Sequence, residues 1–379
     1  MIQRFHGLDR HKKHSTISVL NREGQEVEFV SKCPDLRGYI EELGPEDTVV
    51  MEAATGSFFW ADLIESTGAT CHILHPYKFK IIRDSWNKTD KHDARNMAKA
   101  LWVYLVTGEF GIPTVYKPSV AVRELRRLFC QYNLLNRQVT ALKNTIQAIL
   151  ADNGVSLTCR QKTMLSSETD AKEVLNAYDL SPASLLSIQI NLEILWKVEE
   201  QKNNLKKEIL LAGEPFAAEV KLLITVRGIT PLAALAFLAD VADIRRFKTL
   251  RKMNAYLGLV PRVKESGGRS RTGHINRESR RLTRTLFTQS VMHFAAASPY
   301  LRLCYSNLVS RRGVGRDRIA LIRKICGMMR RMLLEQEEFR WMQPSNFERK
   351  LKRYENQLKK IKKIKEEEEE EEEEERKSA

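Results

Sequence analysis

Alternating strand-like and helix-like segments in the first 110 residues constrain the fold of this chain more than any other feature. In chain order they are strand-like runs at 2–8, 15–20 and 26–30, a helix near 35–43, a strand ending at Glu52, a helix at 57–67, a strand at 70–74 and a helix from Asp90. The turn Asn21–Gly24 joins the second and third runs as a hairpin. The pattern predicts a mixed α/β domain.

Carboxylates stand where this topology would bring them together. The order of elements is that of an RNase H-like fold, in which acids at strand ends converge at one edge of the sheet. Asp9 closes the first strand-like run and Glu52 closes the fourth. Asp90 and Asp93 lie three residues apart in the first turn of a helix for which Thr89 is the expected N-cap. Such oxygen ligands suit Mg²⁺ or Mn²⁺, although acids at a helix start also favour the helix dipole.

Residues 116–214 are predicted to form a helical coiled-coil arm after an N-terminal domain at 1–115. Apolar residues step by three and four along 122–149 and again along 185–205. Asn153–Gly154 ends the first helix and Ser181–Pro182 begins the second. Such an arm either packs inside one subunit or joins two subunits, and the pattern leaves both open.

Residues 215–340 read as a mostly helical domain with a helix-hairpin-helix-like turn. Gly228 permits a tight bend, and the Ala-rich helix that follows would offer its N-terminal amides to a phosphate. Further on, Ser266 precedes two glycines in what is expected to be a flexible basic loop. A serine there is ordinarily a turn former, but an activated hydroxyl can act as a nucleophile. One helix is expected from about Glu278 to Ala297.

The charge of the chain indicates a polyanionic partner. Formal net charge is +15, and leaving out the ten glutamates of Glu366–Glu375 puts the rest at about +25. Nucleic acid is the first expectation for so basic a body, and solubility alone is the alternative. The segment 341–379 is a charged low-complexity tail, solvated helix or disorder, with no assigned chemistry. The candidate nucleic-acid contacts are Arg262, Lys264, Arg269, Arg271, Arg277, Arg280, Arg281 and Arg284.

Cysteine spacing and hydropathy exclude several classes of protein. The six cysteines are scattered with no C-x-x-C pair, which argues against a zinc site and a disulfide framework. The N-terminus lacks the apolar segment of a signal peptide, and no apolar run is long enough to span a bilayer. A reduced, cytoplasmic protein with no membrane partner is expected. Among the histidines, His92 is the one to watch as a ligand or base, because it lies between Asp90 and Asp93.

Six short motifs, taken in order, resemble one family. They are Gly7-Leu8-Asp9, Met51-Glu52-Ala53, Lys88-Thr89-Asp90-Lys91-His92-Asp93-Ala94, Gly228-Ile229-Thr230, Leu257-Gly258-Leu259-Val260-Pro261 and Ser266-Gly267-Gly268. The set resembles the DEDD insertion-sequence transposases of the IS110 family over roughly residues 4–335. The chain departs from the family at Arg227-Gly228-Ile229-Thr230, where Pro-Gly-Ile-Gly is more usual.

The resemblance implies an enzyme that cuts and rejoins DNA, with a RuvC-like domain, a coiled-coil arm and a transposase domain. It implies that Asp9, Glu52, Asp90 and Asp93 hold divalent metal and that Ser266 becomes covalently joined to DNA. It further implies a structured bridge RNA that pairs with donor and target DNA, and a homo-oligomer, dimer to tetramer, at the nucleoid of a bacterial or archaeal cell. The alternatives are a metal-dependent, structure-selective endonuclease resembling a Holliday-junction resolvase, and a non-enzymatic nucleic-acid scaffold.

Overall fold

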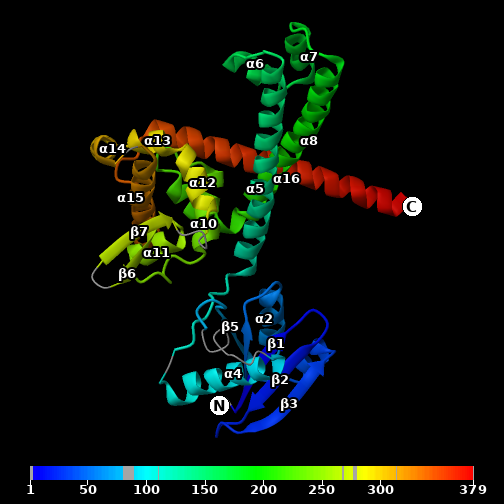
Figure 1. The fold of residues 1–379 in the computed structure, drawn as a ribbon, viewed down its shortest axis with the longest axis vertical. Helices are drawn as coiled ribbons and strands as arrows, with labels where there is room; N and C mark the ends of the chain where they lie inside the picture. The colour runs from blue at the N-terminus through cyan, green and yellow to red at the C-terminus, as the bar shows by residue number, and fades with distance from the viewer. Residues whose placement is uncertain are drawn as a thin grey trace. The chain divides into compact units, whose positions relative to one another are not determined.

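The chain forms two compact units, Met1–Lys117 and Pro118–Ala379, which Figure 1 draws as ribbons. The computed structural model describes residues 3–79, 89–109, 111–266, 269–275, 280–312 and 314–378. The finer division of the second unit at residues 214 and 340 stays a prediction.

The first unit is built on a five-stranded sheet in the order β3-β2-β1-β4-β5. Its strands are β1 (Arg4–Arg10), β2 (Ser15–Leu20), β3 (Glu26–Cys33), β4 (Asp47–Glu52) and β5 (Thr70–Leu74). The first three strands are antiparallel, whereas β1, β4 and β5 run parallel. The predicted mixed α/β domain with a mostly helical remainder is confirmed, and each strand-like run of the sequence is a strand.

Helices cover both faces of this sheet, as Figure 1 shows. They are α1 (Leu36–Glu41), α2 (Ser57–Ser66) and α4 (Asp90–Trp102), the last followed by a π-helical turn, η1 (Val103–Thr107). Phe5 and Val50 pack with Met97 of α4 on one face, while Leu8 and Met51 pack with α1 and α2 on the other. Because side chains alternate along a strand, positions 5, 7 and 9 of β1 and positions 50 and 52 of β4 share the α4 face.

An ion-pair network around the buried Asp47 joins the start of β1 to the start of β4. Asp47, with its side chain fully buried, accepts hydrogen bonds from Arg4 Nε (2.6 Å), His6 Nε2 (2.9 Å) and the Gly44 amide (2.8 Å). Burial alone would raise the pKa of this carboxyl, but the three donors outweigh it and lower the pKa from an ordinary 3.8 to about 2. The charged form is therefore stabilised by folding.

We expect Asp47→Asn to lower the stability of the first unit by about 2 kcal/mol at pH 7. The folded carboxyl has the lower pKa, so its contribution is complete above about pH 4 and disappears as pH falls toward 2. Native-state hydrogen exchange of the β1 and β4 amides checks both the size and the pH range. Glu46→Gln is the control, because Glu46 is exposed and makes only a long ion pair, 4.0 Å, with Arg4. A loss that persists unchanged at pH 2 would contradict this account.

Two long helices, α5 (Val120–Asp152) and α8 (Pro182–Ala212), pack along each other in the second unit (Figure 1). The N-caps are the serines before each helix, Ser119 and Ser181, whose hydroxyls accept amide hydrogen bonds. Two short helices, α6 (Cys159–Met164) and α7 (Glu168–Asn176), contribute to the same hydrophobic cluster. The predicted end of the first helix at Asn153–Gly154 and the predicted start of the second at Ser181–Pro182 are confirmed, and the coiled-coil assignment itself stays a prediction.

The rest of the second unit surrounds the buried helix α10. Its elements are a 3-10 turn, η2 (Glu214–Phe216), α9 (Ala217–Leu223), α10 (Pro231–Val241), α11 (Leu250–Tyr256), β6 (Pro261–Ser266), β7 (Arg269–Ile275), α12 (Leu282–Gln289), α13 (Val291–Ala295), α14 (Pro299–Arg312), α15 (Val314–Glu335) and α16 (Pro344–Ser378). Gly228, between α9 and α10, has φ +91°, and a Cβ there would lie 2.7 Å from the Cβ of His293. The glycine is therefore required both for the turn and for its packing.

Two expectations for this unit need correction. The single helix expected from Glu278 to Ala297 is wrong for the described part, where α12 and α13 meet at Ser290 with φ −97° and ψ 4°. Thr288 just before the break turns its hydroxyl back onto the Arg284 carbonyl at 2.7 Å, a bond that bends helices. The charged tail is helical, and its first half is packed, since Tyr354 and Ile361 are buried in the core.

Candidate active site

The contact between Gly7 and α4 determines how the predicted acids meet. A Cβ at Gly7 would lie 2.0 Å from the Ala94 carbonyl oxygen and 2.4 Å from the Ala98 amide nitrogen. The two backbones therefore touch. One turn back from Ala94 along the helix is Asp90, and two residues on from Gly7 along the same strand face is Asp9. The close contact brings these two carboxylates toward one place.

Asp9 and Asp90 converge on a single imidazole nitrogen. His11 Nε2 lies 3.2 Å from Asp9 Oδ2 and 3.3 Å from Asp90 Oδ2. His14 Nε2 approaches the same Asp90 oxygen at 3.5 Å. The ligand atoms of His11, His14 and Asp90 all lie within 4.8 Å of one another. An acid from a strand end, an acid from a helix start and two histidines from the β1–β2 turn thus form one polar cluster.

The electrostatics of Asp9 favour a bound cation. Burial raises the pKa of the Asp9 carboxyl, whose side chain is 17% exposed, and the neighbouring Asp90 raises it further. His11 and His14 act in the opposite direction. A positive charge placed between the carboxylates would relieve both unfavourable effects on ionised Asp9.

Glu52 ends β4 on the same sheet face as Asp9. The parallel register pairs Leu8 with Met51, so the next positions, Asp9 and Glu52, are neighbours at the strand ends. The Ser57 side chain holds the segment that follows: its hydroxyl accepts from the Ala54 amide at 2.6 Å and donates to the Ala54 carbonyl at 2.7 Å, with the Glu52 carbonyl at 3.3 Å. Glu52 is exposed at this strand end.

Asp93 follows Asp90 by three residues on α4 and is half-buried. Thr89 is the N-cap, as predicted, and accepts the His92 amide at 3.3 Å. The His92 side chain is exposed, and among the described residues the histidines that gather near the acids are His11 and His14 instead. Neither was predicted from the sequence, although their positions two and five residues after Asp9 were an available signal.

The donor set fits a divalent cation. Carboxylate oxygens from Asp9 and Asp90 converge, and Glu52 and Asp93 lie at neighbouring positions of the strand ends and helix start. Carboxylates suit magnesium, calcium and manganese, whereas imidazole nitrogens suit zinc, iron and nickel. The two histidines would therefore favour softer metals, and the carboxylates alone would form an oxygen site for a hard cation.

Ser266 lies in the second unit, on a hairpin rather than in a flexible loop. It is the last residue of β6 and pairs with Arg269, the first residue of β7. Only Gly267 and Gly268, which are outside the described residues, separate the pair. A two-residue Gly-Gly connection is typical of tight hairpins, so the glycines that suggested flexibility are compatible with paired strands. The expectation of a flexible loop is wrong for the paired residues.

The structure assigns a partly internal role to the basic residues after the hairpin. Arg284 Nη1 donates to the Gly258 carbonyl at 2.9 Å, and burial followed by the charge of Arg281 lowers its pKa. Arg280 is half-buried, its amide bonded to the Tyr256 carbonyl at 3.1 Å, and Arg281 is exposed. For the others the structure describes either the backbone alone or nothing: Arg262, Lys264, Arg269 and Arg271 lie on β6 and β7, and Arg277 is outside the described residues.

Comparison with known proteins assigns the segments that carry the acid cluster and the hairpin to one family. A model of DEDD transposases of IS110 elements, described as "Transposase", matches residues 6–153. A second model, described as "Transposase IS116/IS110/IS902 family", matches residues 220–306. The first range contains the acid cluster and the second contains the β6–β7 hairpin. The chain belongs to the IS110 transposase family.

Two curated relatives are similar to this transposase over most of its length. A probable family 20 transposase of Pseudomonas aeruginosa is 28% identical over 289 residues, which is 74% of this chain and 77% of the relative. The transposase for insertion sequence element IS1111A of Coxiella burnetii is 25% identical over 296 residues, 77% of this chain and 79% of the relative. The protein is thus a DNA transposase or recombinase, and its DEDD-type domain indicates a divalent metal.

In the part of the chain that the structure describes, no helix combines the length and the apolar character needed to cross a membrane.

We expect Gly7→Ala to disturb the acid cluster, because the added methyl group would overlap the α4 backbone. Overpacking at a backbone contact should cost about 1–3 kcal/mol and move Asp90 away from Asp9. Gly111→Ala is the matched control, since a Cβ at Gly111 meets nothing within 4 Å. Thermal unfolding and calorimetric titration with Mn²⁺ measure the two effects. Equal metal affinity in wild type and Gly7→Ala would contradict the proposed dependence on this contact.

Proposed function

We propose that this transposase cuts and rejoins DNA through a covalent phosphoserine intermediate at Ser266, with a divalent metal, Mg²⁺ or Mn²⁺, held by Asp9, Glu52, Asp90 and Asp93. The observation that carries the proposal is the convergence of Asp9 and Asp90 on one nitrogen of His11. Membership of the IS110 family and the resemblance of Ser266-Gly267-Gly268 to the family's serine motif support the role of the serine.

The metal would supply charge neutralisation at the phosphate and favour ionisation of the attacking hydroxyl. Asp9 and Asp90 would be the inner pair of ligands, one from β1 and one from α4, with Glu52 and Asp93 completing the oxygen donors. The contact at Gly7 would fix the spacing of the inner pair. His11 and His14 would orient the carboxylates by hydrogen bonding, as polar neighbours of ligands commonly do.

The proposed chemistry at Ser266 is an exchange of phosphodiester bonds. The serine oxygen attacks phosphorus, a phosphoserine bond forms, and the bond to the leaving sugar oxygen breaks, that oxygen departing with a proton. Attack by a sugar hydroxyl of another strand then reverses the step and restores the serine hydroxyl. Because each step forms one ester bond and breaks one, the strands can be exchanged without an external energy source.

Guidance by a bridge RNA that pairs with donor and target DNA belongs to the same proposal. Its support is the family resemblance together with the basic character of the chain, which suits sequence-independent contact with phosphates. Among the described candidate contacts to nucleic acid, Arg281 has an exposed side chain. Arg262, Lys264, Arg269 and Arg271 lie on the hairpin that precedes it. We further propose a homo-oligomer, dimer to tetramer, acting at the nucleoid, with a RuvC-like first domain and a coiled-coil arm.

We expect Ser266→Ala to abolish the covalent protein–DNA adduct and to lower recombination by at least about 10³-fold, because the nucleophile is lost. Ser270→Ala, on the paired strand of the same hairpin, should retain both activities. Denaturing gel electrophoresis of labelled DNA measures the adduct, and a plasmid junction assay measures recombination. Recombination by Ser266→Ala would refute the phosphoserine route, and metal-dependent cutting without an adduct would favour a structure-selective endonuclease.

Substitution of the acids should separate catalysis from binding. Asp9→Asn and Asp90→Asn are expected to lose metal-dependent strand cleavage, whereas His11→Gln should weaken metal binding by about 10–100-fold. Glu41→Gln, an exposed acid on α1, controls for charge. Cleavage is measured with and without a chelator over a range of Mg²⁺ and Mn²⁺. Variants that bind DNA less well while the wild type has no metal-dependent activity would instead indicate a nucleic-acid scaffold.

A further inference from the structure

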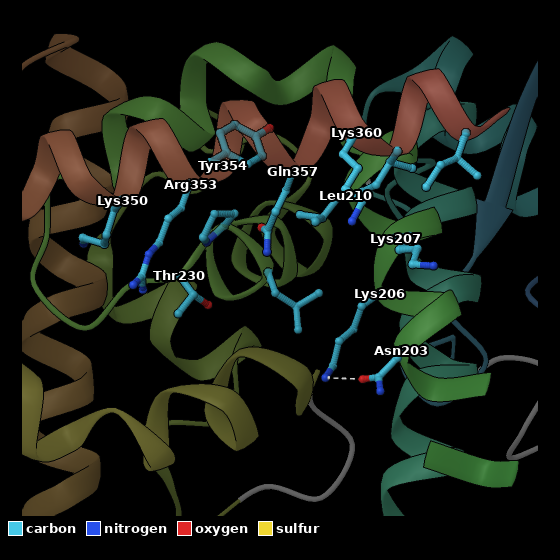
Figure 2. Close-up of a pocket in the computed structure, with 14 residues that line it drawn as sticks. Asn203, Lys206, Lys207, Leu210, Thr230, Lys350, Arg353, Tyr354, Gln357 and Lys360 are labelled. Atoms are coloured by element: carbon cyan, nitrogen blue, oxygen red, sulfur yellow. Dashed lines mark hydrogen bonds between the residues drawn. The ribbon is translucent and has the colours of Figure 1, made fainter. Parts of the chain in front are cut away.

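An open basic cavity of about 700 Å³ lies between α8, the start of α10 and α16 (Figure 2). Its cationic side chains come from two walls, Lys206 and Lys207 from α8 and Lys350, Arg353 and Lys360 from α16. We call this cavity the α8–α16 groove. It lies wholly within the second unit, and both walls fall outside the ranges 6–153 and 220–306 that the family models match. Of the groove, the start of α10 is thus inside a matched range, whereas the two walls are not.

The groove concentrates positive charge without carboxylates to balance it. Among the described residues that line it there is no Asp or Glu, and none of its five cations makes an ion pair. The same two helices do form ion pairs elsewhere: Lys362 pairs with Glu214, and Lys365 lies 2.9 Å from Glu208. Acids are thus available to these helices, yet they lie outside the cavity. Uncompensated like charges raise the free energy of the empty groove, and an anion would lower it.

The α16 wall is anchored to the turn before α10 through Lys350. Lys350 Nζ donates to the carbonyls of Val226 (2.9 Å) and Ile229 (3.2 Å) and to that of Ile224, and burial lowers its pKa to about 8. Its ammonium is therefore a structural link to the turn before α10. Arg353, Gln357, Lys360 and Ile364 follow at steps of four, three and four, and all line the groove. One face of a fixed helix thus points into the cavity.

The floor of the groove is apolar. Leu210 and Ile361 are buried there at 9% and 8% exposure, and Pro231 and Leu232 at the start of α10 complete it. A rim of cations above an apolar floor suits a ligand that carries both phosphates and a flat apolar surface. In duplex nucleic acid the bases are stacked inside and only the backbone is accessible, whereas an unpaired strand can place a base on such a surface.

We propose that the α8–α16 groove binds a single-stranded stretch of nucleic acid. Phosphates lie along Arg353 and Lys360 on one wall and Lys206 and Lys207 on the other, and an unstacked base covers the apolar floor. A cavity of this volume is the size of a pocket for a small organic ligand, which corresponds to very few nucleotides. The inference concerns binding alone and does not depend on the phosphoserine route or on the assignment of the metal ligands.

Fluorescence anisotropy with the full chain tests the proposal. The probes are a 12-nucleotide RNA, the DNA strand of the same sequence, and the corresponding DNA duplex, all with chelator present to prevent cleavage. Each phosphate contact contributes about fivefold to single-strand affinity at 0.1 M salt, so Arg353→Gln/Lys360→Gln should weaken single-strand binding by about 25-fold. The RNA and DNA strands show which sugar the groove accepts, and duplex affinity should change little.

The matched control is Lys352→Gln/Lys359→Gln, which removes the same charge from exposed positions of α16 that do not line the groove. Lys206→Gln/Lys207→Gln tests the opposite wall independently, in case the first variant alters α16. Equal losses in the groove and control variants, or equal losses for duplex and single strand, would overturn the proposal. Binding is measured with chelator present, whereas the proposed chemistry is measured by the adduct and cleavage assays, so failure here is distinguishable from failure of the proposed function.

Discussion

The backbone contact between β1 and α4 is the constraint on which the acid cluster depends. Gly7 has no side chain, and the helix presents only Ala94 and Ala98 to it, so strand and helix approach to direct contact. The contact itself buries little apolar surface. Phe5 on the strand and Met97 on the helix, both almost fully buried, supply that surface on the same sheet face. Packing away from the acids thus stabilises an approach that brings Asp9 and Asp90 together despite their mutual repulsion.

Each unit gathers side chains of one charge at one site, carboxylates in the first unit and cations in the second. In the first unit, Asp9 and Asp90 share a nitrogen of His11, and burial disfavours the ionised form of Asp9. In the second unit, Lys360 and Arg353 line a groove from which carboxylates are absent among the described residues. A nucleic acid accompanied by divalent cations has both complementary charges. Such a partner would therefore match both sites, as expected of a DNA transposase.

Local signals were predictable from the sequence, and features that depend on tertiary contacts were not. Thr89 as N-cap and the carboxylate at the end of β4 follow from residue type and periodicity alone. The approach of His11 depends on the conformation of the turn after β1, which no periodicity specifies. The pairing of Ser266 with Arg269 was obscured because two glycines indicate a loop and a tight hairpin equally well. Roles that rest on family resemblance, above all that of Ser266, remain predictions.

The charge pattern of α16 makes the two ends of the groove different for a bound polyanion. The inner half carries Arg353 and Lys360 on a face anchored by Tyr354, and the run Glu366–Glu375 follows along the same helix. Like charges three and four residues apart destabilise a helix, so the outer half depends on the packed inner half for its order. Its negative charge would repel phosphates at that end of the groove within about a Debye length, roughly 8 Å at physiological salt. A strand bound as proposed would therefore keep to the Arg353 side of the groove, away from the glutamates.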